Sequence, residues 1–99
     1  MAEIKKIKVE NSEFKNKAFG ERYSYVFLRA LKNSPLEGMT VGDMKEIQDI
    51  VNYIESWKDL AILEMSKSDI DIIIAKTRAI KWVVFDDEII QMDNYLASL

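Results

Sequence analysis

The sequence contains no cysteine and no histidine, and these two absences exclude much of protein chemistry. Without cysteine there can be no disulfide and no thiolate nucleophile, so a reducing cytoplasm is the expected location. Without histidine the commonest general base and the Ser-His-Asp triad are missing. The usual ligands of zinc, haem and iron–sulfur clusters are missing as well. We therefore expect no metal and no cofactor.

Glycine is scarce too, and the three glycines, at 20, 38 and 42, form neither a phosphate-binding loop nor a dinucleotide fingerprint. Catalysis would have to depend on carboxylates, lysine or tyrosine. Glu64 and Asp69 are one conceivable acid–base pair, but nothing in the sequence places them together. We therefore expect a protein that is not an enzyme and that has no evident small-molecule substrate.

Long apolar runs are also absent. The longest is far below the roughly 18 residues that suggest a membrane span, and the first ten residues hold no run suited to a signal peptide. The composition, with one proline, 31% charged and 48% hydrophobic residues, is unlike that of a disordered chain or of a turn-rich β-sandwich. Residues 1–99 are expected to form one small domain around a single core, without membrane association.

Charge is unevenly distributed about the net value of −3. Residues 1–32 carry eight lysines or arginines and four acids, a charge of +4, whereas residues 33–99 carry six basic and thirteen acidic residues, a charge of −7. Lys5, Lys6 and Lys8 make the first residues basic. Such runs are usually solvated surface; the alternative is a contact surface for an acidic partner or for a second copy of the chain.

The first twenty residues are predicted to form a basic arm made of a strand and a loop. Ile7 and Val9 fit the period of two that a half-buried strand shows, within residues 4–9. A short apolar segment near 61–65 fits a second extended segment, which would pair with the first. Whether the first strand pairs within the chain or with another copy is left open by the sequence.

Residues 21–99 are predicted to form a helical body. Apolar residues at helical spacing, together with capping residues, indicate four helices, over about 21–33, 40–57, 69–82 and from 86 to the end. Pro35 ends the first helix, and Ser66 and Ser68 compete to cap the third. The expected fold is mainly α, with about four helices in two hairpins around one core and a possible two-stranded β addition.

The stretch GMTVGDMKEIQDIVNYIESW, residues 38–57, fits either one amphipathic helix or a helix-turn-helix that reads DNA. Thr40 is a favourable N-cap, and Asp43 three residues later resembles a capping box. The apolar stripe then continues through Val41, Met44, Ile47, Ile50, Val51 and Ile54. A helix-turn-helix would need a break midway, and the exposed face is acidic. One long helix is therefore predicted, and DNA reading by it is disfavoured.

The last helix is predicted to begin at Asp86, next to a dense group of carboxylates. Its apolar stripe is expected to consist of Phe85, Ile89, Met92 and Leu96. Asp86, Asp87 and Glu88, with Asp93 two turns later, could in principle bind Mg²⁺ or Ca²⁺. Capping and the positive end of the helix dipole explain three acids at this place equally directly. We prefer the interpretation that these acids stabilise the start of the helix to the interpretation that they bind a metal.

The aromatic residues supply a candidate contact surface. Tyr23, Tyr25 and Phe27 alternate along the predicted first helix, so they cannot all face the core. Phe19, Tyr25 and Trp57 are the residues that we expect to contribute to an exposed apolar patch, because aromatics anchor protein interfaces. The alternative is ordinary packing in the core and at its rim.

The apolar spacing, the capped helices and a tryptophan at 82 suggest a resemblance to a group of known proteins. These features lie in two segments, LRALKNSPLEGMTVGDMKEIQDIVNYIE and LEMSKSDIDIIIAKTRAIKWVVFDDEIIQMDNYL. Together they cover residues 28–96, and they resemble small uncharacterised proteins of tailed bacteriophages and prophages. The resemblance transfers no catalytic or binding residue. It implies a small accessory protein that acts in virion assembly or on a host protein.

These observations predict a non-enzymatic, cytoplasmic protein that binds another protein or itself. The partner surface would use Lys5, Lys6, Lys8 and the aromatic residues Phe19, Tyr25 and Trp57. The alternative is a DNA-associated regulator that uses the basic N-terminal third. Nucleic acid binding is disfavoured because the long helix that would read DNA is acidic.

Overall fold

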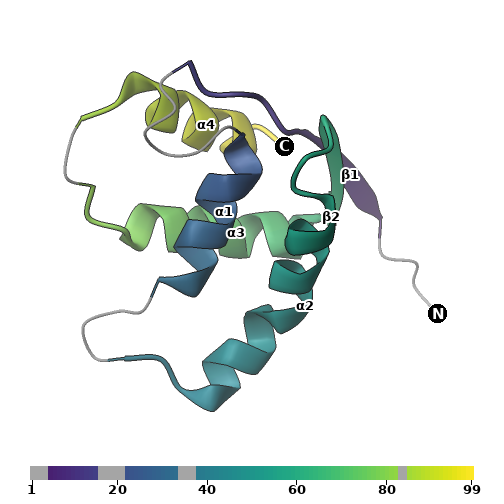
Figure 1. Cartoon of the computed structure of the whole chain (residues 1–99), viewed down its shortest axis with the longest axis vertical. Helices are drawn as coiled ribbons and strands as arrows, with labels where there is room; N and C mark the ends of the chain where they lie inside the picture. The colour runs from purple at the N-terminus through teal and green to yellow at the C-terminus, as the bar shows by residue number, and fades with distance from the viewer. Residues whose placement is uncertain (1–4, 16–21, 34–37, 83–84) are drawn as a thin grey trace.

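The computed structural model describes residues 5–15, 22–33, 38–82 and 85–99. These residues form four helices and two strands, which confirms the prediction of a mainly α fold with a small β addition. In chain order the elements are β1 (Lys6–Glu10), α1 (Tyr23–Lys32), α2 (Val41–Trp57), β2 (Ile62–Ser66), α3 (Lys67–Ala79) and α4 (Asp87–Ala97) (Figure 1).

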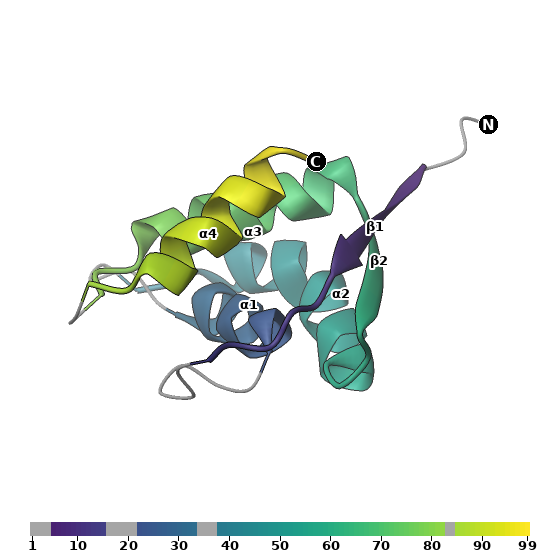
Figure 2. The ribbon, with the colours of Figure 1, turned by 90° about the horizontal axis from the view of Figure 1, so that it is seen from above.

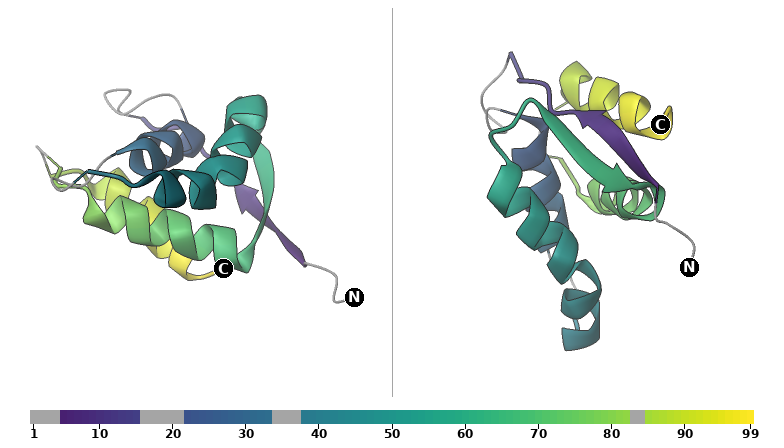
Figure 3. Two further views of the ribbon diagram at one scale, coloured as in Figure 1. Left: turned by 90° about the horizontal axis from the view of Figure 1, so that it is seen from below. Right: turned by 90° about the vertical axis from the view of Figure 1, so that its right-hand side faces the viewer.

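The helices lie in two layers. Figure 2 shows α1 and α2 in one layer and α3 and α4 in the other, with the two strands along one side. Helix α1 contacts both α2 and α3, and α3 also contacts α4. Figure 3 shows that the first half of α2 extends well beyond the other elements. This half of α2 therefore has a much smaller share of the core than the second half.

Strands β1 and β2 pair antiparallel within the chain, from Lys6 opposite Ser66 to Glu10 opposite Ile62. The predicted pairing is confirmed, with the first strand at 6–10 instead of 4–9, and residue 4 lies outside the described part. Val9, Leu63 and Met65 are buried on one face of this sheet, as the alternation of side chains requires.

Each outer edge of the sheet receives a tyrosine hydroxyl. The backbone N–H of Glu10 donates to Tyr95 Oη at 2.9 Å on the β1 side. The backbone N–H of Glu64 donates to Tyr53 Oη at 2.8 Å on the β2 side. Unpaired edge groups can recruit other strands, so these two contacts attach the sheet to α4 and α2 and satisfy one edge amide on each side.

The core takes residues from every element. Its fully buried centre includes Phe27 and Leu31 of α1, Ile54 of α2, and Met92 of α4. Phe14 is also buried, and its ring lies 5.0 Å from that of Tyr23. The sequence predicts only a loop at this place, because the residues around Phe14 have no regular apolar period. The loop nevertheless closes one end of the core.

A buried polar cluster joins this loop to α1 and to the end of α2. The side-chain amide of Asn11 donates to Ser24 Oγ at 3.1 Å and to the carbonyl oxygens of Lys58 and Leu60 at 2.9 and 2.7 Å. Its Oδ1 accepts from the backbone N–H of Ser24 at 2.8 Å, and Ser24 Oγ donates to the Lys58 carbonyl at 2.6 Å. Asn11 and Ser24 are 1% and 0% exposed. We call these two residues the Asn11–Ser24 clamp.

The three predicted helix caps are present. Thr40 and Asp43 form a reciprocal capping box, with Asp43 N–H donating to Thr40 Oγ1 at 3.0 Å and Thr40 N–H donating to Asp43 Oδ2 at 3.2 Å. Ser66, and not Ser68, accepts from the backbone of α3. Asp86 accepts from Glu88 N–H at 2.8 Å at the start of α4. These caps satisfy backbone donors that have no partner inside the helix.

Replacing Thr40 by alanine is expected to lower the free energy of unfolding by about 1 kcal/mol, because the backbone N–H of Asp43 loses its acceptor, the Thr40 hydroxyl. Urea denaturation followed by circular dichroism measures this change. Thr40→Ser keeps the hydroxyl and is the matched control. Equal losses in the two variants would mean that the cap does not stabilise α2.

One predicted apolar stripe is wrong at its first residue. Phe85 was expected to pack with Ile89, Met92 and Leu96, but its side chain is 81% exposed. The reason is the backbone: Asp86 is the N-cap, with φ −141° and ψ 117°, so Phe85 precedes the helix and does not share its periodicity. The other three residues of the stripe are buried as predicted.

Candidate functional site

Helix α2 has one apolar stripe buried in the core and a second, mainly apolar stripe of which Val51 alone packs partly against the core. Ile47, Ile50 and Ile54 are buried. The second stripe consists of Val41, Met44, Gln48 and Val51, and its first two members are 65% and 49% exposed. The sequence predicts one continuous apolar stripe along this helix, and the structure divides its residues between the core and this second, more exposed stripe. The first two turns of α2 extend past the elements that would cover them (Figure 3).

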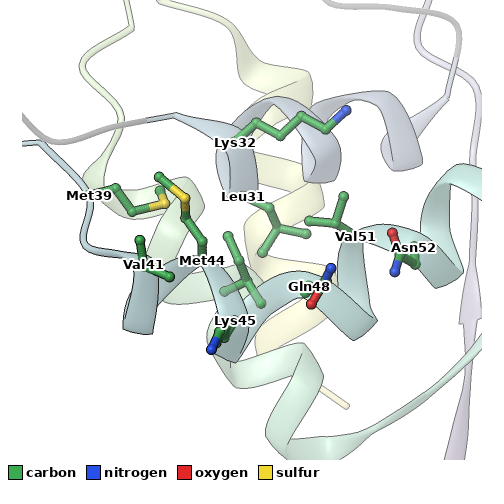
Figure 4. Close-up of a pocket in the computed structure, with 10 residues that line it drawn as sticks. Leu31, Lys32, Met39, Val41, Met44, Lys45, Gln48, Val51 and Asn52 are labelled. Carbon is green, nitrogen blue, oxygen red and sulfur yellow. The ribbon is translucent and has the colours of Figure 1, made fainter.

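The second stripe forms one side of an apolar groove. The end of α1 and the residues before α2 form the rest, and the hollow has a volume of about 520 Å³. Figure 4 shows Met39, Val41 and Met44 gathered at one end of this groove, Val51 and Asn52 at the other, and Leu31 between them. The complete lining is Leu31, Lys32, Met39, Val41, Met44, Lys45, Ile47, Gln48, Val51 and Asn52. We call it the α1–α2 groove.

The groove has an adaptable apolar lining. Two of its residues, Met39 and Met44, are methionines, whose flexible and polarisable side chains fit surfaces of varied shape. The polar groups that line it are Gln48, Asn52 and the two lysines. No described carboxylate lines it. This combination suits an amphipathic segment of another protein much better than a polar metabolite.

An ion pair connects the end of α1 to α2 beside the groove. Lys32 on α1 donates to Glu55 on α2, and Lys58 lies 3.8 Å from the other carboxylate oxygen. The hydrogen bond from Lys32 lowers the pKa of Glu55 below its ordinary value. The stabilisation from this pair is therefore present above the unfolded-state pKa of the carboxyl and is lost as the pH falls through the lower folded-state value. Because the pair is exposed, its contribution is small at neutral pH.

A second hollow joins two of the residues predicted from the sequence to contact a partner. Lys8 and Trp57 both line a depression of about 510 Å³ between the outer face of the sheet and the end of α2. The other lining residues are Tyr53, Leu60, Ile62 and Glu64. Trp57 is about half exposed. Leu60 and Ile62 extend this apolar surface, which periodicity in a short segment could not reveal.

The remaining predicted contact residues lie apart. Lys5 is exposed beside the sheet, and the Lys6 amine lies 5.7 Å from the centre of the Tyr53 ring. The hydroxyl of Tyr25 donates to Asp59 at 2.7 Å, and Tyr25 does not line either hollow. Phe19 lies outside the described residues. The expected cluster of Phe19, Tyr25 and Trp57 therefore stays a prediction.

Three of the carboxylates near α4, those of Asp86, Glu88 and Asp93, have structural partners. Asp86 is the N-cap, and Glu88 accepts from the backbone N–H of Lys15 at 2.8 Å. Asp93 accepts two bonds from the Arg78 guanidinium, at 2.9 and 3.0 Å, and these bonds raise the pKa of Arg78. Within the described ranges, no three metal-binding side chains are close enough to share an ion. Asp86 is thus engaged in capping α4.

Glu64 and Asp69 do share one depression, which the sequence could not predict. Its volume is about 380 Å³, and Glu46, Asp49 and Lys6 also line it. The two carboxylates come from β2 and from the first turn of α3. With Lys6 among them, these acids form a mixed and largely solvated surface. Such clusters usually reflect ordinary surface charge.

No model of a protein family, no curated protein and no solved structure matches the chain in comparison with known proteins. In the described part of the chain, no helix has the length and hydropathy needed to cross a membrane.

Proposed function

We propose that the protein is a non-enzymatic protein-binding component and that the α1–α2 groove is its docking site. The observation that carries this proposal is the exposure of Val41 and Met44, at 65% and 49%, along a hollow whose lining is mainly apolar. Covering side chains of this size would contribute about 1 kcal/mol or more each. A well-capped helix that presents them to solvent is the kind of feature that protein interfaces use.

The sequence resemblance gives this proposal a more specific form. We take the protein to be a bacteriophage accessory protein that acts in virion assembly or on a host protein. The basic arm supplies less support for DNA binding, because Lys6 lies over Tyr53 and shares a depression with Glu46, Asp49 and Glu64. These acids oppose the approach of phosphate groups.

The test replaces both exposed residues of the groove in one variant, Val41→Glu with Met44→Glu. Because the two side chains are largely exposed, we expect the free energy of unfolding to change by less than about 1 kcal/mol. We expect the variant to lose the proteins that the tagged wild type captures from a bacterial host lysate. Quantitative mass spectrometry measures that loss.

The matched control is Ile90→Glu on α4, where the side chain is also exposed and does not line the groove. It should capture the same proteins as the wild type. A double groove variant that captures an unchanged set would contradict docking in the groove.

A further inference from the structure

The second stripe of α2 has the spacing of a helix that pairs with another helix. Val41, Met44, Gln48, Val51 and then Glu55 follow steps of three and four residues. This is the spacing at which two helices pack side by side with a small crossing angle. Val41, Met44 and Val51 are apolar, and Glu55 at the end is held by Lys32. The stripe therefore offers about three turns of mainly apolar surface around one polar residue, Gln48.

We propose that the occupant of the α1–α2 groove is α2 of a second copy of this chain, packed antiparallel, with Gln48 beside the twofold axis. This inference rests on the proposed docking site and names its partner. A twofold interface must be complementary to itself. Gln48 meets that condition because a side-chain amide has both donors and acceptors, so two copies can bond to each other. Met44 and Val51, on either side of Gln48, would then face one another across the axis.

The charges at the rim of α2 select the antiparallel arrangement. Lys45 and Asp49 are both exposed, and within the described residues neither has a salt-bridge partner. With Gln48 on the axis and a rise of 1.5 Å per residue, Lys45 of one copy and Asp49 of the other differ by about 3 Å along the helix. Both lie on the same flank of the stripe, so two Lys45–Asp49 pairs would form. A parallel pair in register would put Lys45 and Asp49 of one copy on the opposite side of the interface from those of the other, so these pairs could not form.

The absence of cysteine makes a direct test possible. A Gln48→Cys variant has one thiol, so any disulfide that it forms joins two copies. Antiparallel packing around residue 48 brings the two Cα atoms into the 4.4–6.8 Å range that a disulfide needs. We expect most of the protein to become a covalent dimer under mild oxidation at micromolar concentration. Glu46→Cys, which is exposed on the opposite side of α2, is the matched control and should remain mainly monomeric.

A charge exchange tests the register by a different measurement. Lys45→Glu places two acids near each other across the interface, and we expect the dissociation constant from sedimentation equilibrium to rise about tenfold. Adding Asp49→Lys to that variant restores opposite charges and should recover most of the affinity. Lys81→Glu, an exposed position outside the groove, makes the same change in net charge and should have no comparable effect.

Four outcomes separate this inference from the proposed function. Crosslinking of the Gln48→Cys variant, together with recovered affinity in the double charge variant, supports both the docking site and the second copy as its occupant. A dimer that persists with Val41→Glu and Met44→Glu, and that does not crosslink at 48, overturns the α2 interface. A monomeric wild type whose captured proteins depend on the groove overturns the second copy as occupant and retains the docking site. A groove variant that changes neither self-association nor capture overturns both.

Discussion

Replacing Phe27 by alanine is expected to lower the free energy of unfolding by about 3–5 kcal/mol. The side chain is fully buried on α1, the helix that contacts both α2 and α3. Its ring also lies 6.4 Å from that of Tyr23. Truncation removes the packing of a whole ring and leaves a cavity at the junction of the two layers. Since a domain of this size has a total stability of about 5–15 kcal/mol, the variant would approach the limit of folding.

The chain contains a matched control for this experiment. Phe85→Ala makes the same chemical change at a side chain that is 81% exposed. We expect it to alter the free energy of unfolding by less than about 0.5 kcal/mol. Urea titrations of both variants, followed by tryptophan fluorescence, provide the comparison. Similar losses at the two positions would contradict the assignment of Phe27 to the core and of Phe85 to solvent.

Replacing Asn11 by alanine is expected to lower the free energy of unfolding by about 2–4 kcal/mol, because several buried polar groups lose their partner at once. The carbonyl oxygens of Lys58 and Leu60 each lose a donor, and the backbone N–H of Ser24 loses its acceptor. The replacement is small and apolar, so it cannot supply any of these bonds. Thermal unfolding by calorimetry should show a fall in Tm of roughly 10–25 °C.

Two comparisons distinguish the Asn11–Ser24 clamp from a general effect of removing an amide. Asn94→Ala removes an exposed amide from α4 and should leave stability unchanged or slightly higher, since alanine favours helices. Combining Asn11→Ala with Ser24→Ala should cost less than the sum of the two single changes, because the residues bond to each other. Strict additivity would show that they do not act as one unit.

The helices, caps and strands were predictable because each depends on residues close together in the chain. Thr40 and Asp43 lie three residues apart, and the caps at Ser66 and Asp86 are equally local. The alternation at Ile7 and Val9 indicated the first strand. Local signals of this kind persist in the folded protein because tertiary packing does not oppose them.

The Asn11–Ser24 clamp could not be predicted, because it joins groups that are far apart in the sequence. Asn11 lies in a polar stretch that reads as solvated loop, and its partners include carbonyl groups at residues 58 and 60. A backbone carbonyl left free at the end of a helix has no signature in the sequence. Burial of Phe14 escaped prediction for the same reason, since a single aromatic residue without a period does not indicate which surface it will meet.

The candidate groove was only half predictable. Periodicity identified every apolar residue that α2 contributes to it, but did not show that Val41 and Met44 lie outside the core. An apolar stripe shows that a surface favours burial, but it does not show whether the same chain supplies the cover. Lys8 and Trp57 line one hollow because β1 pairs with β2 beside α2. This arrangement belongs to the tertiary structure and has no local signal in the sequence.

The pairing of β1 with β2 has a consequence for the newly made chain. Glu10 at the end of β1 lies opposite Ile62, more than fifty residues later. At a synthesis rate of about 5–20 residues per second, the first strand waits for several seconds before its partner leaves the ribosome. During that delay its exposed lysines, Lys6 and Lys8, discourage pairing with a strand of a neighbouring nascent chain. The same lysines that suggest a binding arm would thus keep the unfinished protein apart from its neighbours.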